Sequence, residues 1–314
     1  MNYEKISSEI QDHCATVTIN RPRAYNALDE QTLRELEDAF RSAANDDAVS
    51  VLVLTGAGER AFCTGADLKE QEQFLKRPHD YYKWFGAFQD MHDQLRWIGK
   101  PTIARLNGIV VGGGNELNLA CDLAIAADHI TIRQIGNSRG SVAAGGATQW
   151  LPIFIGDRRA REMLWLNEEI PAQKALEWGL VNQVVPYAEL DAAVDAMVEQ
   201  LLRKMPEVMR YTKTQTNFWK EFAWSQTVMH ARDWLTLHAA SDEVREGLES
   251  FREKRAVDYE KLRQPHPSPL LHKEREMALP WGDYTQTCEH CGAARLPSEM
   301  KFCGNCGNAL TNDQ

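Results

Sequence analysis

The sequence has no long hydrophobic stretch. No apolar run approaches the roughly 18 residues that a membrane-spanning helix needs. The N-terminal segment MNYEK also lacks the hydrophobic region of a signal peptide. We therefore expect a cytoplasmic protein that does not span a membrane.

Positive charge is also in short supply. The 314 residues include 35 Lys and Arg against 45 Asp and Glu, a formal net charge of -10 at pH 7. Because affinity for nucleic acid comes largely from clustered Lys and Arg, this balance disfavours a nucleic-acid binder with a broad basic surface.

Hydrophobic residues make up 43% of the chain. The chain can therefore bury a core, either as one large domain plus a small one or as two ordinary domains.

Cysteines are few, and four of the seven fall into two close pairs near the C-terminus. Cys288 and Cys291 form the first pair, and Cys303 and Cys306 form the second, with eleven residues between the pairs. Four thiolates at this spacing can close a tetrahedral zinc site, as in a zinc ribbon. A redox disulfide is the alternative, but two symmetric pairs exceed what one redox switch requires, and a reducing compartment favours metal. The other cysteines, scattered among apolar residues, are Cys14, Cys63 and Cys121.

The predicted zinc ribbon is expected to be structural. Glycines at positions 292, 304 and 307 suit tight turns beside the cysteines. A metal also supplies the stability that so short a segment cannot draw from a core. Since four cysteine ligands leave no open position on zinc, we expect structure or contact with a protein partner rather than catalysis.

Three successive glycines, Gly112, Gly113 and Gly114, mark a sharp turn between a β-branched run and Glu116. Without Cβ atoms the backbone can turn tightly, and a ligand can approach it closely. The amides at the first turn of the following helix have no intrahelical acceptor, so they can bind an oxyanion. Taken alone, the motif fits a purely structural turn equally well.

The hydrophobic pattern predicts strands separated by helices up to residue 136, and helices from Gly145 onward. Residues 3–20 alternate as a strand, Asp29 is placed to cap a helix, and residues 49–55 suit a strand buried on both faces. This order predicts an α/β core. The segment QPHPSP, residues 264–269, cannot continue a helix. We therefore predict a catalytic domain at 1–263, a linker at 264–284 and the zinc ribbon at 285–310.

Two segments together resemble the oxyanion-hole segments of the crotonase, or enoyl-CoA hydratase/isomerase, superfamily. They are AFCTGADLKE, residues 61–70, and GGGNE, residues 112–116. NRP and YNAL, within residues 20–28, resemble the family's CoA-contacting segment, and GATQWLP and ALEWGLV match its later landmarks. The resemblance extends over residues 3–263. It implies an α/β fold, a crotonase-like spiral of ββα units, with a helical C-terminal region that mediates assembly into a homotrimer or a dimer of trimers.

The resemblance also implies a substrate and site residues. The substrate is an acyl-CoA thioester, and the amides of Ala66 and Gly113 stabilise the enolate oxyanion that forms when the α-carbon loses a proton or the β-carbon is attacked. Glu116 matches a catalytic acid-base glutamate of the family. The resemblance also implies contacts with CoA. For any cationic side chain among them, the alternative is an ordinary surface charge exposed to water. The implied CoA contacts are Arg23, Tyr25, Ala27 and Lys254.

The chain departs from the family's two-glutamate hydratases at Gly136, where the second glutamate would fall. Glycine can do no acid-base chemistry. The surrounding residues 134–148 resemble a ring-acting subgroup, with 6-oxocyclohex-1-ene-1-carbonyl-CoA hydrolase as the nearest pattern. We expect Gly136 to leave room beside the reacting carbons, and the aromatic stretch from Tyr81 to Phe88 to form an apolar wall. Ser141 either hydrogen-bonds a substrate oxygen or caps a turn.

We therefore predict an acyl-CoA lyase or hydrolase that hydrates an enoyl-CoA with a bulky or cyclic acyl group, with cleavage of a ring C–C bond as an extension. The alternatives are a hydratase or isomerase for linear acyl chains, and a catalytically weak CoA-binding protein that acts through its zinc ribbon.

Several histidines have no spacing that suggests a triad or a metal site, and we expect most to lie on the surface or to have their hydrogen bonds satisfied. They are His13, His92, His129, His230 and His238.

Overall fold

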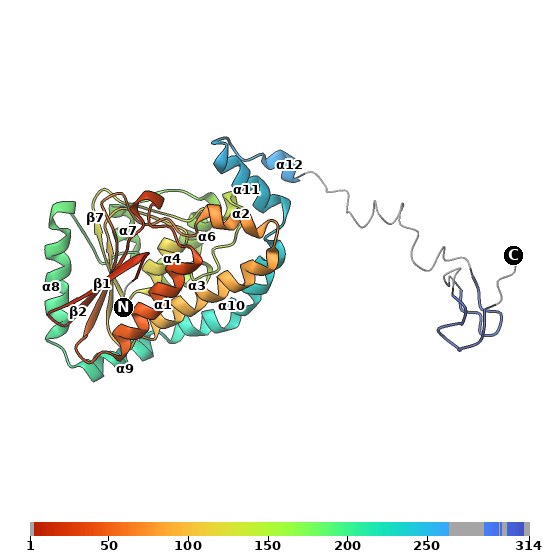
Figure 1. Cartoon of the computed structure of the whole chain (residues 1–314), viewed down its shortest axis with the longest axis horizontal. Helices are drawn as coiled ribbons and strands as arrows, with labels where there is room; N and C mark the ends of the chain where they lie inside the picture. The colour runs from red at the N-terminus through yellow and green to blue at the C-terminus, as the bar shows by residue number, and fades with distance from the viewer. Residues whose placement is uncertain (1–2, 264–285, 295, 297–299, 311–314) are drawn as a thin grey trace. The chain divides into compact units, whose positions relative to one another are not determined.

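The computed structural model describes residues 3–263, 286–294, 296 and 300–310. The chain divides into two compact units, Met1–Val257 and Asp258–Gln314 (Figure 1). The predicted linker, residues 264–284, lies outside the described residues. Each unit is considered by itself below.

A six-stranded sheet forms the centre of the first unit, in the order β1-β2-β3-β5-β7-β10. Its first pair is antiparallel and each later pair is parallel. Continuous apolar sequence, such as that of β3, forms a strand that is buried on both faces. The strands are β1 Ile6–Gln11, β2 Cys14–Ile19, β3 Val51–Gly56, β5 Thr102–Leu106, β7 Leu123–Ala127 and β10 Gln183–Val185.

The strand predicted for residues 3–20 is two antiparallel strands. Asp12 and His13, with φ of 47° and 65°, form the turn between β1 and β2. Two consecutive left-handed residues match the right-handed twist of a hairpin, although Asn-Gly is the usual sequence for this turn. Because neither turn residue is glycine, the break between the two strands is hard to recognise in the sequence.

A second, four-stranded sheet has the order β4-β6-β8-β9. β4 pairs in parallel with β6, and β6 with β8, whereas β9 is antiparallel to β8. These strands are very short, so the sequence alone did not distinguish β4 from a loop. They are β4 Ala61–Cys63, β6 Ile109–Val111, β8 Thr131–Arg133 and β9 Ile170–Pro171.

Consecutive strands enter the two sheets alternately. β3 lies in the large sheet and β4 in the small one, and β5 with β6 and then β7 with β8 repeat this arrangement. Helices follow each strand pair: α2 Leu68–Phe74 and α3 Pro78–Arg96, then α4 Gly113–Ala120, then α5 Ala147–Ile155. The predicted crotonase-like succession of ββα units is thereby confirmed. Because β4, β6 and β8 are parallel neighbours, the loops at their carboxyl ends meet at one edge of the small sheet.

Helices α1, Glu30–Asn45, and α10, Phe218–His238, pack on either side of α3 (Figure 1). The predicted cap of α1 is confirmed, since the carboxylate of Asp29 accepts a hydrogen bond from the Thr32 amide at 2.8 Å. One face of α1 buries Leu33, Leu36 and Phe40 in the core. Helical spacing of apolar residues therefore sufficed to predict this packed helix.

The other helices of the first unit cover the sheets or extend the chain beyond them. Helix α8 packs against β3, β5 and β7, and α9 precedes the long α10. No described helix is long and apolar enough to cross a membrane. The remaining helical bounds are α6 Asp157–Leu166, α7 Ala172–Trp178, α8 Leu190–Leu202, α9 Pro206–Thr216 and α11 Asp242–Arg252, with the 3-10 helices Pro22–Ala24, Gly136–Ser138 and Tyr187–Glu189.

The described part of the second unit contains α12, Tyr259–Arg263, and a segment with four cysteines. Two antiparallel bridges, Gln286 with Leu296 and Phe302 with Ala309, close this segment around its cysteines. Each bridge flanks one Cys-x-x-Cys turn. The segment therefore consists of two similar turns, as the sequence spacing predicts.

Candidate active site

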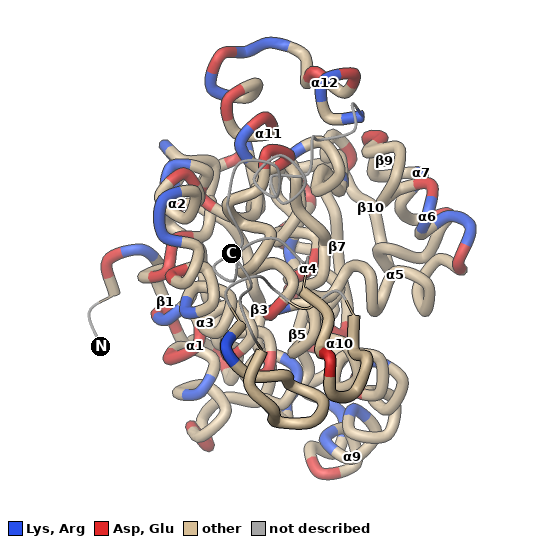
Figure 2. The backbone as a smooth tube through the Cα atoms, turned by 90° about the vertical axis from the view of Figure 1, so that its right-hand side faces the viewer, with Lys and Arg blue, Asp and Glu red and all other residues tan. Residues whose placement is uncertain are grey.

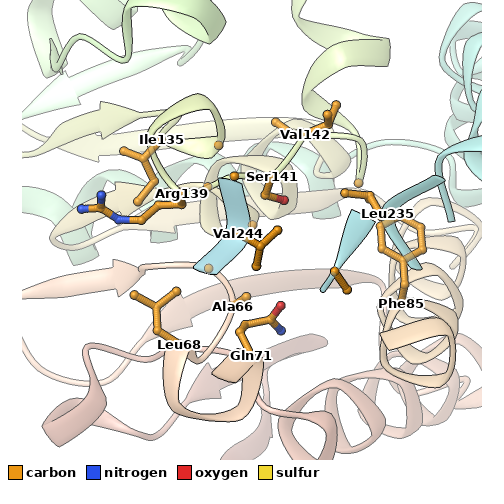
Figure 3. A pocket seen from close by; sticks show the side chains of 18 of the residues that line it. Ala66, Leu68, Gln71, Phe85, Ile135, Arg139, Ser141, Val142, Leu235 and Val244 are labelled. Atoms are coloured by element: carbon orange, nitrogen blue, oxygen red, sulfur yellow. The ribbon is translucent and has the colours of Figure 1, made fainter. Parts of the chain in front are cut away.

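A cavity of about 140 Å³ lies where the loops after β4, β6 and β8 meet. Its lining includes Ala66, Gly113 and Gly136 from these three loops, and residues of α2, α3, α4, α10 and α11 add to its walls. Figure 3 shows side chains from these separate segments facing one another across it. A water molecule needs roughly 10–15 Å³ of such volume. The cavity therefore has room for a group of several heavy atoms.

Two backbone amides face this cavity without a partner. Leu28 hydrogen-bonds to the residues on both sides of Ala66, since its amide donates to Gly65 O at 2.8 Å and its carbonyl accepts from Asp67 N at 2.9 Å. This parallel pattern directs the Ala66 N–H to the opposite side. Gly113 is the first residue of α4, where an amide has no intrahelical acceptor. Within the described residues neither amide donates a hydrogen bond.

Close contact between the two loops explains why glycines occur here. A Cβ at Gly65 would lie 2.7 Å from Gly113 N, and φ of +80° at Gly65 disfavours any side chain. Gly112 also has a positive φ, 55°, which turns the chain from β6 into α4. The glycines therefore let the backbones of the two loops touch and bring the Ala66 and Gly113 amides to one cavity.

Glu116 on α4 is the only acidic side chain among the described residues that line the cavity. It is 5% exposed, and the Ala147 N–H donates to its Oε1 at 3.2 Å. A Cβ at Gly145 would lie 2.9 Å from its Oε2, so glycine leaves the carboxylate its space. Burial raises the pKa of Glu116 to about 7, although amide hydrogen bonds from Ala147 and Gly145 oppose the shift. At neutral pH this group can therefore both accept and return a proton.

The aromatic wall predicted for residues 81–88 is present. Tyr81, Trp84, Phe85 and Phe88 line the cavity from one side of α3. Ser141, one of the predicted site residues, also lines it, and its side chain hydrogen-bonds Tyr81. Burial raises the pKa of Tyr81, and the charge of Glu116 raises it further. The hydroxyl-bearing residues Tyr81 and Ser141 therefore line the same cavity as the Glu116 carboxylate.

The expectation that Gly136 leaves open space is wrong. A Cβ at Gly136 would lie 2.5 Å from the backbone oxygen of Ser141 and 3.5 Å from the amide of Ala143. The Ser141 amide donates to Gly136 O at 3.0 Å, which holds the loop in place. The backbone of residues 141–143 thus occupies the position toward which a side chain at 136 would point.

The far end of the cavity is mostly apolar and comes from the C-terminal helices. Leu235 on α10 and Val244 on α11 both line the cavity, and Figure 3 shows them on separate segments of the chain. His238 also lines this end, and its Nε2 lies 3.1 Å from Glu243 Oε2 and 3.2 Å from Ser241 Oγ. Sequence reasoning missed this role of His238, because its neighbours in the cavity come from distant segments.

The segment implied in CoA contact lies beside the Ala66 loop. The Thr64 hydroxyl donates to the backbone oxygen of Tyr25 at 3.2 Å, and the Arg60 guanidinium stacks on the Tyr25 ring at 4.3 Å. Ala27 is buried and Arg23 is exposed. Lys254 is exposed just after α11, with φ of 54°. The structure brings the 22–27 segment to the Ala66 loop, but it places neither Arg23 nor Lys254 in the cavity lining.

Comparison with known proteins agrees with this geometry. The family model described as enoyl-CoA hydratase/isomerase matches residues 9–263. The chain belongs to the enoyl-CoA hydratase/isomerase family. A crystal structure of an enoyl-CoA hydratase from Mycobacterium avium subsp. paratuberculosis K-10 is 26% identical, covers 82% of this chain and 99% of its own, and has a TM-score of 0.75. An enoyl-CoA hydratase from Bacillus anthracis is 31% identical, with coverages of 81% and 98% and a TM-score of 0.66.

The four cysteines follow the enoyl-CoA hydratase/isomerase match, which ends at residue 263. Their sulfur atoms all lie within 4.8 Å of one another. Cys288 Sγ is 3.6 Å from Cys306 Sγ, and Cys291 Sγ is 3.6 Å from Cys303 Sγ. Four sulfurs around zinc, each about 2.3 Å from the metal, are about 3.8 Å apart. The sulfur positions therefore fit a tetrahedral metal site.

The backbone around the cysteines is that of two equivalent turns. The Gly292 amide donates to Cys288 O at 2.8 Å, and the Gly307 amide donates to Cys303 O at 2.8 Å. Both glycines have a positive φ, 70° and 74°, that a side chain would disfavour. These turns direct all four sulfurs inward, so the cysteines can hold a metal without help from the enoyl-CoA hydratase/isomerase domain.

Proposed function

We propose that the protein is an acyl-CoA lyase or hydrolase that stabilises an enolate oxyanion and hydrates an enoyl-CoA with a bulky or cyclic acyl group. One observation carries the proposal. A buried carboxylate with a pKa of about 7 faces the same cavity as two unpaired backbone amides. Membership of the enoyl-CoA hydratase/isomerase family supports the same chemistry.

The thioester oxygen accepts hydrogen bonds from the amides of Ala66 and Gly113. As water attacks the β-carbon, Glu116 takes one of its protons and the electrons of the double bond move to the thioester oxygen as an enolate. The proton on Glu116 then passes to the α-carbon, which completes the addition of water. Each oxyanion donor is worth about 2.7–4 kcal/mol in acyl chemistry, because it needs no reorientation when the charge develops.

The walls of the cavity favour a bulky or cyclic acyl group. Aromatic rings of α3 and apolar side chains of α2, α10 and α11 contribute to its lining. Such surfaces stabilise hydrocarbon by removing it from water. Phe85 and Leu235 both line the cavity and appear toward the same side of it in Figure 3, where we expect the part of the acyl group remote from the thioester to pack.

A panel of thioesters tests this function. The protein is incubated with crotonyl-CoA and with cyclohex-1-ene-1-carbonyl-CoA, and the products are weighed by mass spectrometry. We expect a gain of one water molecule, with faster turnover of the ring thioester. A ring thioester that carries an oxo group is tested in the same way. If its product gains a second water molecule, the enzyme also opens the ring. Faster hydration of crotonyl-CoA than of any ring thioester would contradict the proposed acyl specificity, and no hydration of either would contradict the enzyme function.

We propose that Cys288, Cys291, Cys303 and Cys306 hold a structural zinc ion. The sulfur separations and the two glycine turns support this assignment. Zinc would fix the two turns to each other, which a segment with so little apolar interior needs. The purified protein is expected to contain about one zinc per chain by elemental analysis. A protein prepared with zinc present that contains none would rule out the assignment.

We propose that α9 and α10 form a self-association surface, in a homotrimer or a dimer of trimers. Val208 and Tyr211 on α9 and Phe218, Trp219 and Phe222 on α10 are exposed. Figure 2 shows few charged residues along α10 compared with α2 and α6. Exposed apolar surface of this kind is typical of protein interfaces.

Sedimentation velocity tests the assembly. Phe222→Glu places a charge in the apolar surface and is expected to lower the mass of the assembly. Ile10→Glu, on the exposed side of β1, adds the same charge elsewhere and should leave the mass unchanged. A wild-type protein that sediments as a monomer would contradict the proposal.

A further inference from the structure

Water that adds to an enoyl thioester has two hydrogens, and Glu116 accepts one of them. The other hydrogen needs an acceptor, because a water free to rotate is poorly placed for attack. A second carboxylate at position 136 would meet this need, but that position is glycine, and the backbone of Ser141 occupies the space beside it. Of the polar side chains that line the cavity, Tyr81 carries a hydroxyl close enough for the Glu116 charge to raise its pKa, and Ser141 hydrogen-bonds to it.

We propose that Tyr81 is a catalytic residue that holds the attacking water against Glu116, and that Ser141 orients the Tyr81 hydroxyl. The proposal rests on the hydration function proposed above. It assigns the work of the absent second carboxylate to a neutral phenol on a different element, α3. Tyr81 touches the water, and Ser141 acts through Tyr81.

The ring of Tyr81 is held rigidly. It is 8% exposed. Phe74 meets it edge-on, with ring centroids 5.4 Å apart and planes at 85°. Trp84 and Phe85, from the next turn of α3, lie 5.7 and 6.2 Å from it. Because three aromatic neighbours hold the ring, the hydroxyl keeps its position before a substrate arrives, and no ordering is needed during the reaction.

The phenol oxygen of Tyr81 can accept a hydrogen bond from the attacking water. A phenol oxygen has two lone pairs. The hydrogen bond with Ser141 lowers the pKa of Tyr81 and occupies at most one of these lone pairs. The second is left for a hydrogen of the water. Burial and the Glu116 charge raise the pKa of Tyr81, which keeps the phenol neutral while the carboxylate is ionised.

The loop at Gly136 explains how Ser141 reaches Tyr81. The Ser141 amide donates to Gly136 O, and the Ser141 carbonyl lies where a Cβ at 136 would stand. Absence of a side chain at 136 thus lets the 141–143 segment approach the cavity. Packing alone would be satisfied by phenylalanine at 81. Packing does not require a hydroxyl that contacts a cavity-lining serine and lies near the carboxylate.

Tyr81→Phe tests the proposal, with Tyr82→Phe as a matched control. Tyr82 loses the same atom, but its ring lies under the Arg232 guanidinium, at 3.7 Å, and does not line the cavity. Two reactions are compared: hydration of cyclohex-1-ene-1-carbonyl-CoA, and exchange of the α-hydrogen of cyclohexanecarbonyl-CoA in deuterium oxide. Exchange needs Glu116 and the oxyanion donors but no attacking water.

We expect Tyr81→Phe to lower kcat for hydration by about 10- to 100-fold, below the upper range for acid-base groups, with KM and α-exchange nearly unchanged. Ser141→Ala should cause a smaller loss with the same split, and the double variant should lose less than the product of the two because the residues act through one water. Tyr82→Phe should match the wild type in both reactions. Ser141→Ala keeps the test available if Tyr81→Phe misfolds.

Two results would overturn the role of Tyr81 while leaving the proposed function intact: normal hydration by Tyr81→Phe, or equal losses in hydration and exchange, which indicate a structural defect. Failure of the wild type in both reactions would remove the proposed function and the role of Tyr81 together. These outcomes are distinguishable, because the wild type reports on the function and the variant on the tyrosine.

Discussion

The cavity beside Glu116 and the four-cysteine cluster differ in how the chain builds them. Ala66, Gly113 and Gly136 follow three separate strands and meet because β4, β6 and β8 are parallel neighbours. Cys288 to Cys306 form one continuous segment, and the turns that hold the sulfurs lie between the ligands themselves. Local spacing is therefore enough to define the cluster, whereas the cavity depends on close contact between distant backbones. Substitutions should accordingly have different consequences in the two regions.

Glu116→Gln should have the largest effect on the cavity. It removes the proton acceptor but keeps an oxygen for the Ala147 amide, so the loop geometry is retained. We expect kcat for hydration to fall by about 100-fold or more, measured with the best substrate of the panel. Glu199→Gln, on the exposed side of α8, makes the same chemical change and should have no effect. Near-normal turnover by Glu116→Gln would end the assignment of Glu116.

Gly65→Ala should have the next largest effect, because a Cβ there would lie 2.7 Å from Gly113 N and separate the two amide donors. Loss of one such donor costs about 100- to 1,000-fold in kcat, and partial displacement should cost about a tenth of that. Gly58→Ala is the matched control: its φ is +78°, but nothing lies within 4 Å of the added Cβ.

Both glycine variants carry the strain of a left-handed residue, so both should unfold at a lower temperature. Only Gly65→Ala should lose hydration activity. Equal activity losses in the two variants would show that strain, rather than displacement of the amides, is responsible.

The burial of Glu116 should also be visible as a pH-dependent cost in stability. Its pKa is raised from 4.5 to about 7, so the folded state binds the proton more tightly than the unfolded state. Its contribution to stability is present below pH 4.5 and is lost as the pH rises through about 7. At about 1.36 kcal/mol per pKa unit, Glu116→Gln should stabilise the protein by up to roughly 3 kcal/mol at pH 8.

Denaturant unfolding of the wild type and Glu116→Gln between pH 5 and pH 8 measures this cost. The advantage of the glutamine variant should grow with pH. A difference that stays constant across the range would mean that Glu116 titrates with its ordinary pKa.

Loss of the cysteine cluster should have the smallest effect on the cavity. Cys291→Ser, or truncation after Pro265, should remove about one equivalent of zinc per chain and leave hydration within about twofold of the wild type, since the ligands lie outside the matched family domain. Cys14→Ser, at a cysteine in β2, should change neither. If truncation prevents folding of the remaining chain, the independence of the two regions is disproved.

Several features of the fold were predictable because neighbouring residues decide them. Asp29 caps α1 with its own side chain. The apolar sequence of β3 needs burial on both faces wherever it lies. The glycine turn leads into α4 as expected, although Gly113 and Gly114 already belong to the helix, and its free first amides follow from helix geometry. The Cys-x-x-Cys pairs belong to the same class, since each turn is closed by bonds within a few residues.

Other features depended on residues far apart in the sequence. The small strand β4 contains too few residues for a hydrophobic period, and only its pairing with β6 defines it. The supposed space at Gly136 is filled by the backbone of residues 141–143. His238 gains a place in the cavity because α10 and α11 close one end of it.

The sequence by itself determined the chemistry that is available: a glutamate after a glycine turn, aromatic residues at helical spacing and four paired cysteines. The tertiary structure decided which of these groups face one another and in what dielectric surroundings. Glu116 has an ordinary carboxyl group, but burial beside Gly145 and Phe88 raises its pKa to about 7. Tyr81 is one aromatic residue among several on α3, but only its hydroxyl is near both Ser141 and the Glu116 charge. Burial and approach are properties of many segments packed together, and short-range spacing does not contain them.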